Sequence, residues 1–277
     1  MPIQSHFATN VDKNTPINKG HYCLDTKERT DRFYHLIAER YGNPDLYFAY
    51  RSQWNDPLST ADARDYPLHL DLELVSTCNL NCEMCYTISD EFKAKVVKGF
   101  MDKELAFKII DEIADSVFSL RLSFRGESTL HKNIFDIIGY AKERGIKEVS
   151  FLTNATRLDL NYYKRLSSAG LDWLTCSVDG TGEIYEKIRF PTKFPSLIDK
   201  LNLIAKYRTT HNAVYPLIKI QGILPAIEQS GPTVYYKTFE AIADLIAFNP
   251  LIDYFSKPSE ENMMEHFMCL QPFQRLV

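Results

Sequence analysis

Short strand-like runs alternate with helical patterns along most of this 277-residue chain. The segment 102–116, for example, places Leu105, Ile109 and Ile113 four residues apart, after Asp102 as the predicted N-cap. A βαβα order predicts an α/β fold with a parallel sheet, and right-handed crossovers curl that sheet into an open or closed barrel. The strand-like runs begin near residues 68, 119, 148, 172, 216 and 251.

In the predicted strands, apolar and polar residues alternate, which is unusual for parallel strands. Parallel strands are usually buried on both faces and read as continuous apolar runs. The first strand, LHLDLELV, instead sets its leucines against His69, Asp71 and Glu73. In a barrel wrapped by helices the apolar set faces outward, so the polar set is expected to line a lumen open enough to admit a substrate. An open sheet with one solvated face is the alternative.

The second and fifth strands repeat this alternation, with polar residues at every other position. We therefore expect the polar set of all three strands to point inward and to act on a substrate. The predicted catalytic lumen residues are Glu73, Arg121, Arg125, Lys219 and Gln221.

Residues 1–67 have a different character. A polar start is followed by TDRFYHLIAERYG, in which Phe33, Leu36, Ile37 and Tyr41 share one helical face. We expect a small, mostly helical N-terminal extension.

Three of the six cysteines crowd into the segment STCNLNCEMCY, as Cys78, Cys82 and Cys85. They follow the carboxyl end of the first strand, where α/β barrels place their chemistry. Three closely spaced thiolates can hold three irons of a four-iron cubane and leave the fourth iron open. A structural zinc stays possible, but it needs a fourth close ligand, and the nearest histidines in sequence are His69 and His131.

Composition argues against a disulfide among these cysteines. The chain is 45% hydrophobic and 25% charged and lacks an apolar run long enough to span a bilayer, so it is expected to be soluble and globular. The polar N-terminus has no apolar signal core, which predicts a cytoplasmic protein with reduced thiols. A net charge of −4 with dispersed basic residues predicts neither a nucleic-acid nor a membrane partner.

The spacing Cys78-x3-Cys82-x2-Cys85 resembles the cluster loop of the radical S-adenosylmethionine (radical SAM) enzymes. Later stretches resemble further signatures of that family, in the same order: SFRGESTLH, FLTNAT and CSVDGTGEIYEKIR. The resemblance covers about residues 68–277 and implies a partial (β/α)6 TIM-like barrel. Four positions depart from the family pattern: Met84 stands in place of an aromatic residue before the third cysteine, Arg125 in place of a glycine, Ser128 in place of a proline, and Ala155 in place of a glycine.

The resemblance also implies cofactors and residue roles. The three cysteines would hold a [4Fe-4S] cluster, and Glu127 with the Gly126 backbone would help hold the amino group of S-adenosylmethionine. Each polar candidate has a structural alternative, such as a turn residue for Asn154 or a surface cation for Arg189. The predicted cofactor-binding residues are Tyr86, Gly126, Glu127, Asn154, Ser177 and Arg189.

The family chemistry is reductive cleavage of S-adenosylmethionine to a 5′-deoxyadenosyl radical, which abstracts hydrogen from a substrate. The resemblance implies a peptide or carbohydrate-like substrate and an electron donor of the flavodoxin or ferredoxin type. A zinc-stabilised cytoplasmic binding module without radical chemistry is the alternative function.

The end of the chain resembles the SPASM or twitch subgroup, whose members carry a further iron–sulfur domain. We expect a truncated chain in which Cys269 is the first ligand of an auxiliary cluster that only a longer chain could complete; a buried terminal cysteine is the alternative. Cys176 is expected to be a packing thiol and Cys23 incidental. The predicted domains are 1–67 for the extension, 68–257 for the core barrel and 258–277 for a linker and the start of the auxiliary domain.

Overall fold

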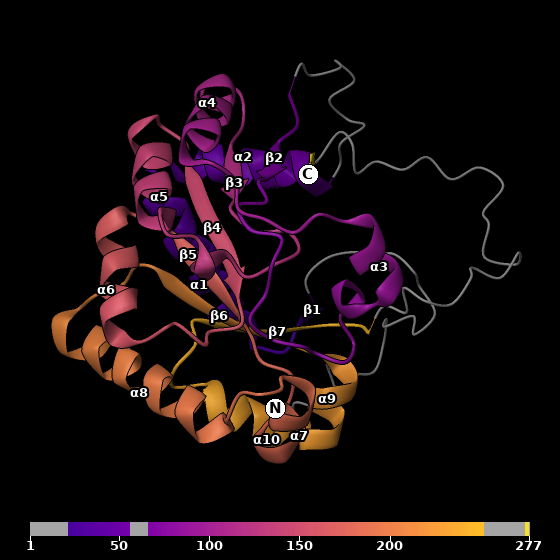
Figure 1. Ribbon diagram of the computed structural model, residues 1–277. Helices are drawn as coiled ribbons and strands as arrows, with labels where there is room; N and C mark the ends of the chain where they lie inside the picture. Colours follow the sequence, from indigo (N-terminus) through magenta and orange to yellow (C-terminus); the bar gives the residue numbers. More distant parts are fainter. Residues whose placement is uncertain (1–21, 56–65, 252–274, 277) are drawn as a thin grey trace, which may run out of the picture.

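The computed structural model describes residues 22–55, 66–251 and 275–276, and in these a curled sheet carries helices along its outer face (Figure 1). Its strand order is β1-β7-β6-β5-β4-β3-β2-β8, and β2 to β7 run parallel in sequence order. This is the partial (β/α)6 TIM-like barrel that the resemblance implied. The six central strands are β2 (His69–Asp71), β3 (Ser119–Arg121), β4 (Glu148–Thr153), β5 (Trp173–Ser177), β6 (Leu217–Ile223) and β7 (Leu245–Asn249).

Two short strands extend the sheet at its edges. β1 (Tyr22–Cys23) pairs antiparallel with β7, and β8 (Arg275–Leu276) pairs parallel with β2. The N-terminal extension thus contributes a strand to the sheet as well as helices. The rest of the C-terminal segment, including Cys269, lies outside the described residues, and the predicted domain boundaries stay predictions.

Helices cover the outer face of the sheet because the outward side chain of each strand is apolar. Leu120, Phe151 and Ile220 are fully buried in the main hydrophobic core, together with residues of the covering helices. Figure 1 shows α4, α5, α6 and α8 side by side along this face. The helices after β2 are α3 (Asp90–Lys95), α4 (Lys103–Ile113), α5 (Ile134–Glu143), α6 (Leu160–Ala169), α7 (Gly182–Ile188), α8 (Phe194–His211), α9 (Leu224–Ser230) and α10 (Pro232–Phe239), with the 3-10 turns η2 (Tyr86–Ile88) and η3 (Ser128–Leu130).

Most of the expected elements that fall within the described residues are present. The helix predicted after Asp102 is α4, although the Asp102 side chain makes no capping hydrogen bond. The strand expected from residue 251 onward lies almost entirely outside the described residues. The sixth parallel strand is β7, which ends at Asn249 and was not predicted; it is held by its ladder to β6 and by the Asp244 carboxylate, which accepts the Ile218 N–H at 2.7 Å.

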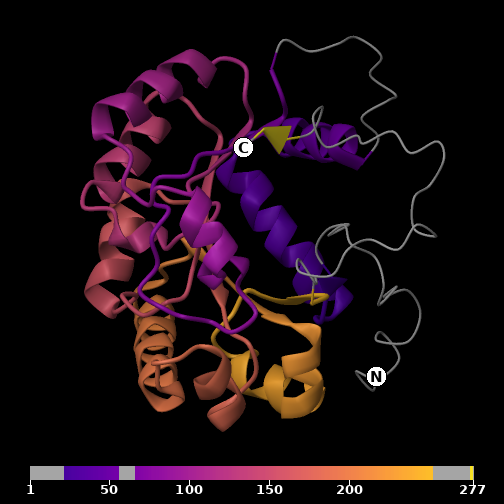
Figure 2. The ribbon, with the colours of Figure 1, turned by 45° about the vertical axis from the view of Figure 1, so that its right-hand side comes forward.

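The two helices of the extension pack against the amino-terminal end of the barrel. These are α1 (Lys27–Arg40) and α2 (Pro44–Asn55), which Figure 2 shows on the side of the strands away from α4, α5 and α6. Phe33 of α1 and Tyr47 of α2 share a second core cluster with Leu68, Leu217 and Leu245, which stand at the starts of three strands. The extension therefore closes the base of the barrel. In the described ranges, no helix combines the length and apolarity needed to cross a bilayer.

Phe33→Ala tests whether this base is part of the folded core. Phe33 is 3% exposed and its ring meets Trp173 of β5 edge-on, so its truncation should cost about 3–5 kcal/mol of unfolding free energy. Phe48→Ala is the control in α2, since Phe48 is 41% exposed and should cost less than about 1 kcal/mol. Urea unfolding measures both values, and equal small losses would show that α1 is not packed as described.

Candidate functional site

The loop that carries the cysteines rests against the loop after β3. The Glu127 N–H donates to the Thr77 carbonyl at 2.8 Å, and Gly126 lies against the same stretch of backbone. A Cβ at Gly126 would stand 2.3 Å from the Thr77 oxygen and 2.4 Å from the Val75 oxygen, which no side chain can do. The glycine is required by this close approach, because only a residue without a Cβ lets the two loops touch.

A hydrogen-bond donor approaches the sulfur of each of the three cysteines. The backbone N–H of Leu80 lies 3.5 Å from Cys78 Sγ, and the Asn154 amide lies 3.7 Å from the same atom. The other two cysteines each have one such neighbour: Arg189 Nη1 lies 3.8 Å from Cys82 Sγ, and Thr87 Oγ1 lies 3.0 Å from Cys85 Sγ. Donors around sulfur stabilise a thiolate, which is the form that binds metals.

The protonation of these thiols depends on what binds them. Burial raises the pKa of both the Cys78 and Cys82 thiols, and the nearby donors and the Arg189 charge oppose that rise. A bound metal centre must therefore displace thiol protons. Across the described part of the chain, no three His, Cys, Asp or Glu side chains gather closely enough to hold a single ion. A mononuclear zinc takes all its ligands on one ion, whereas a cubane takes each thiolate on a different iron.

Glu127 joins the loops that surround the cysteines. Its Oε1 accepts hydrogen bonds from the Thr129 hydroxyl at 2.6 Å and from the Thr153 hydroxyl at 2.7 Å, and its Oε2 accepts from the Asn154 N–H at 2.7 Å. With 2% exposure, this carboxylate links the ends of β3 and β4. The expected contact of Glu127 with a cofactor amine stays a prediction, and the structure adds a positioning role that the sequence did not reveal.

Arg189 is a largely buried cation, with 14% of its side chain exposed, and not a free surface one. Its Nε donates to Asp179 Oδ2 at 2.6 Å, and Asp179 Oδ1 in turn accepts the Ile223 N–H at 2.8 Å. The charge of Asp179 raises the pKa of the guanidinium against the opposing effect of burial, so Arg189 stays charged beside Cys82. The ion pair of Asp179 with Arg189 could be recognised only once the fold was known.

The inner face of the sheet carries the polar set predicted from alternation. Asp71 is 2% exposed and accepts from His69 Nε2 at 2.8 Å and from Arg121 Nη2 at 2.6 Å. Glu73 lies two residues beyond the end of β2. Its carboxylate accepts two hydrogen bonds from Arg125, from Nε to Oε2 and from Nη2 to Oε1, both at 2.7 Å. Arg125 also lies over the ring of Phe92 in α3, so it sits at the carboxyl rim beside the cysteine loop.

The remaining predicted residues lie at two levels of the barrel. Ser177 and Gln221 are register partners at the carboxyl ends of β5 and β6, and both are half-buried. Lys219 lies one layer deeper and is 2% exposed. Tyr86 begins η2 directly after Cys85 and meets Phe92 edge-on. The structure thus brings the predicted residues to one end of the barrel and its interior, while their roles stay predictions.

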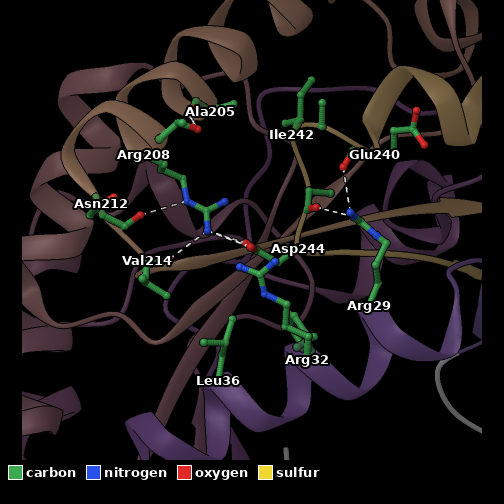
Figure 3. Close-up of a pocket in the computed structure, with 15 residues that line it drawn as sticks. Arg29, Arg32, Leu36, Ala205, Arg208, Asn212, Val214, Glu240, Ile242 and Asp244 are labelled. Atoms are coloured by element: carbon green, nitrogen blue, oxygen red, sulfur yellow. Dashed lines mark hydrogen bonds and ion pairs between the residues drawn. The ribbon is translucent and has the colours of Figure 1, made fainter.

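A separate pocket lies at the opposite, amino-terminal end of the barrel. It has a volume of about 380 Å³ and lies between α1, the end of α8 and the loops before β6 and β7 (Figure 3). Two of its arginines brace the chain: Arg29 donates to Asp25 and to two carbonyls, and Arg208 donates to Asp244 and Val214. We interpret this pocket as structural, because these cations are held by protein groups.

Gly126→Ala tests the close approach of the two loops. The added methyl must push the Thr77 backbone away, so we expect a loss of roughly 1–3 kcal/mol in stability and reduced iron uptake on anaerobic reconstitution. Gly99→Ala is the matched control in the same region, because a Cβ there meets nothing within 4 Å. An alanine at 126 with unchanged stability and iron content would contradict the described packing.

Lys219→Met tests the buried amine. Burial lowers the pKa of Lys219 from 10.5 to about 7, so between these pH values the unfolded chain holds a proton that the folded chain lacks. The unfolding free energy of the wild type, relative to Lys219→Met, should therefore rise from pH 7 to pH 10, by at most about 1.4 kcal/mol per pH unit. Urea unfolding across this range measures the difference, and a difference independent of pH would disprove the shift.

Sequence comparison finds relatives that match parts of the chain. The cofactor-modifying protein of tungsten-containing aldehyde ferredoxin oxidoreductase from Pyrococcus furiosus is 34% identical over 160 residues, which cover 56% of this chain and 43% of the relative. Fe-coproporphyrin III synthase from Methanosarcina barkeri is 30% identical over 112 residues, which cover 40% and 27%. The chain thus spans less than half the length of these two relatives.

Solved structures share the fold at low identity. Native anSMEcpe with bound AdoMet superposes with a TM-score of 0.55 at 21% identity, over 71% of this chain and 55% of that one. SuiB from Streptococcus suis bound to S-adenosylmethionine gives a TM-score of 0.52 at 14% identity, over 73% and 43%. These likenesses support the partial-barrel architecture and no more.

The sequence profile of one family covers the cysteine loop and the strands around it. The match runs over residues 72–221, which is more than half of the chain. It includes the three cysteines, Glu127 and Arg189. By this match the chain belongs to the radical SAM superfamily.

Proposed function

We propose that this chain forms the core of a radical SAM enzyme that abstracts hydrogen from a peptide or carbohydrate-like substrate. The observation that carries the proposal is the set of three cysteines beyond β2, each with a donor within 4 Å of its sulfur. When bound, a [4Fe-4S] cluster and S-adenosylmethionine supply one-electron cleavage of the sulfonium C–S bond and a 5′-deoxyadenosyl radical.

The donor set fits such a cluster. Cys78, Cys82 and Cys85 would be its ligands, because their spacing leaves one iron without a protein ligand. Asn154 and Arg189 would orient and charge-balance the sulfurs through the contacts already described. The Gly126 close approach supports the same site, since it holds the cysteine loop against the backbone after β3.

The carboxyl rim offers the groups that would hold S-adenosylmethionine. Glu127 and the Gly126 backbone lie beside the cysteine loop, and Ser177 lies at the end of β5. In this proposal Tyr86 and Arg189 flank the cofactor, and the substrate enters the lumen, where Glu73, Arg121, Arg125, Lys219 and Gln221 position the target C–H bond and exclude water.

The partners follow from the chemistry. One electron must reach the cluster, and a flavodoxin- or ferredoxin-type protein is the proposed donor. An auxiliary cluster with Cys269 as its first ligand belongs to the proposal only for a longer chain. The fold neighbour SuiB, solved with S-adenosylmethionine, is consistent with this subgroup.

Cysteine variants test the proposal. Changing any one of Cys78, Cys82 or Cys85 to Ala should abolish cluster retention and 5′-deoxyadenosine formation, because two thiolates cannot hold the same cubane. Iron analysis, the visible absorption of the reconstituted protein and product assay with dithionite measure the outcome. Cys23→Ala is the control, since Cys23 lies at the edge strand β1 and should keep full iron content.

The expected wild-type value is about four irons per chain. Retention of a full cluster by one of the three variants would refute the ligand assignment. Binding of zinc alone by the wild type would refute the radical function and favour the zinc-stabilised binding module.

A further inference from the structure

The lumen is open at its carboxyl end and closed one layer below. Glu73, Ser177 and Gln221, which form the upper layer of inward residues, are all half-buried. One layer deeper, Ser150 is 0% exposed and Lys219 is 2% exposed. We call this lower layer, in which Arg121 keeps 18% of its side chain exposed, the floor of the lumen.

Two hydrogen-bond donors on this floor have no partner. Arg121 Nε and Ser150 Oγ are both buried and make no hydrogen bond among the described residues. They stand side by side, because Arg121 of β3 and Ser150 of β4 are register partners. Leaving a buried donor unsatisfied costs about 1–3 kcal/mol, so an acceptor at this point is expected.

The charges around the floor favour an anion as that acceptor. Asp71, on β2, is shared between Arg121 and His69. Below it, Glu148 accepts from the Ser119 hydroxyl at 2.7 Å, and burial raises the pKa of this carboxyl.

Three basic groups lie near the same interior. Burial lowers the pKa of Lys219 of β6, and the charges of Arg121 of β3 and Arg51 of α2 lower it further, whereas Cys23 on β1 has the opposite effect. An anionic group bound beside them would favour the charged form of Lys219.

We propose that the substrate presents an anionic group, a carboxylate or a phosphate, to the lumen floor, where Arg121 Nε and Ser150 Oγ donate to it and Lys219 faces it. This inference rests on the proposed function, because it names the substrate class of that site. The binding site is distinct from the Arg189 region, where S-adenosylmethionine is proposed to bind. It would anchor the substrate below the rim and leave its other end toward the cysteine loop.

The test uses the full chain with its reconstituted, oxidised cluster and saturating S-adenosylmethionine, so that the cofactor carboxylate already occupies its own place. Inorganic phosphate and acetate are titrated separately at constant ionic strength, with chloride as the reference. Thermal unfolding and calorimetry report the dissociation constants. The variants are Lys219→Met, which removes a buried amine, and Ser150→Ala, which removes a buried hydroxyl that makes no hydrogen bond among the described residues; both should fold.

In the wild type we expect at least one of the two anions to bind and raise the unfolding temperature. Lys219→Met should weaken binding at least about tenfold, and Ser150→Ala at least about threefold, as expected for a charged and a neutral hydrogen bond. Lys206→Met, at an exposed position of α8, should behave as the wild type. Binding of phosphate alone would indicate a phosphate-bearing substrate, and binding of acetate alone a carboxylate.

Two results would overturn the inference: no binding of either anion to the wild type, or binding that neither floor variant weakens. Iron content and visible absorption, measured on the same samples, report the proposed function independently. A protein that takes up no cluster but binds an anion through Lys219 and Ser150 would retain the anion site and lose the radical function. A protein that takes up a full cluster but binds neither anion would retain the radical function and lose the anion site.

Discussion

A charged side chain inside a barrel must be paired or must give up its charge, and this constraint shapes the inner face of the sheet. Asp71 meets it by accepting from both His69 and Arg121. Lys219 meets it differently, because burial lowers the pKa of its amine to about 7. The polar interior is therefore stable only because its groups are set in register, strand by strand.

The same requirement organises the carboxyl rim. The Glu127 carboxylate is buried, and the donors that satisfy it come from the loops after β3 and β4. Its own N–H reaches the cysteine loop at Thr77. One buried acid thus ties together the three loops that surround Cys78, which explains how a loop rich in polar residues can hold its cysteines in place.

Features that depend on local sequence pattern could be predicted from the sequence, whereas features that depend on long-range packing could not. The polar alternation of β2, β3 and β6 could be recognised from single strands, because successive side chains point to opposite faces. The position of β7 could not, since it depends on pairing with β6 across the sheet. Likewise, Ala155 was noted in place of a glycine, but only the backbone shows that it adopts a φ of +60°, where a side chain is disfavoured.

The βα order, the polar alternation of the strands and the three-cysteine loop follow from residues close together in the chain, so they could be predicted before the fold was known. Three other features depend on the folded arrangement: α1 and α2 close the base of the barrel, Arg189 is paired with Asp179 beside Cys82, and Arg121 and Ser150 are neighbours on adjacent strands. These contacts join residues far apart in sequence, and their partners are chosen by burial and by the register of the sheet.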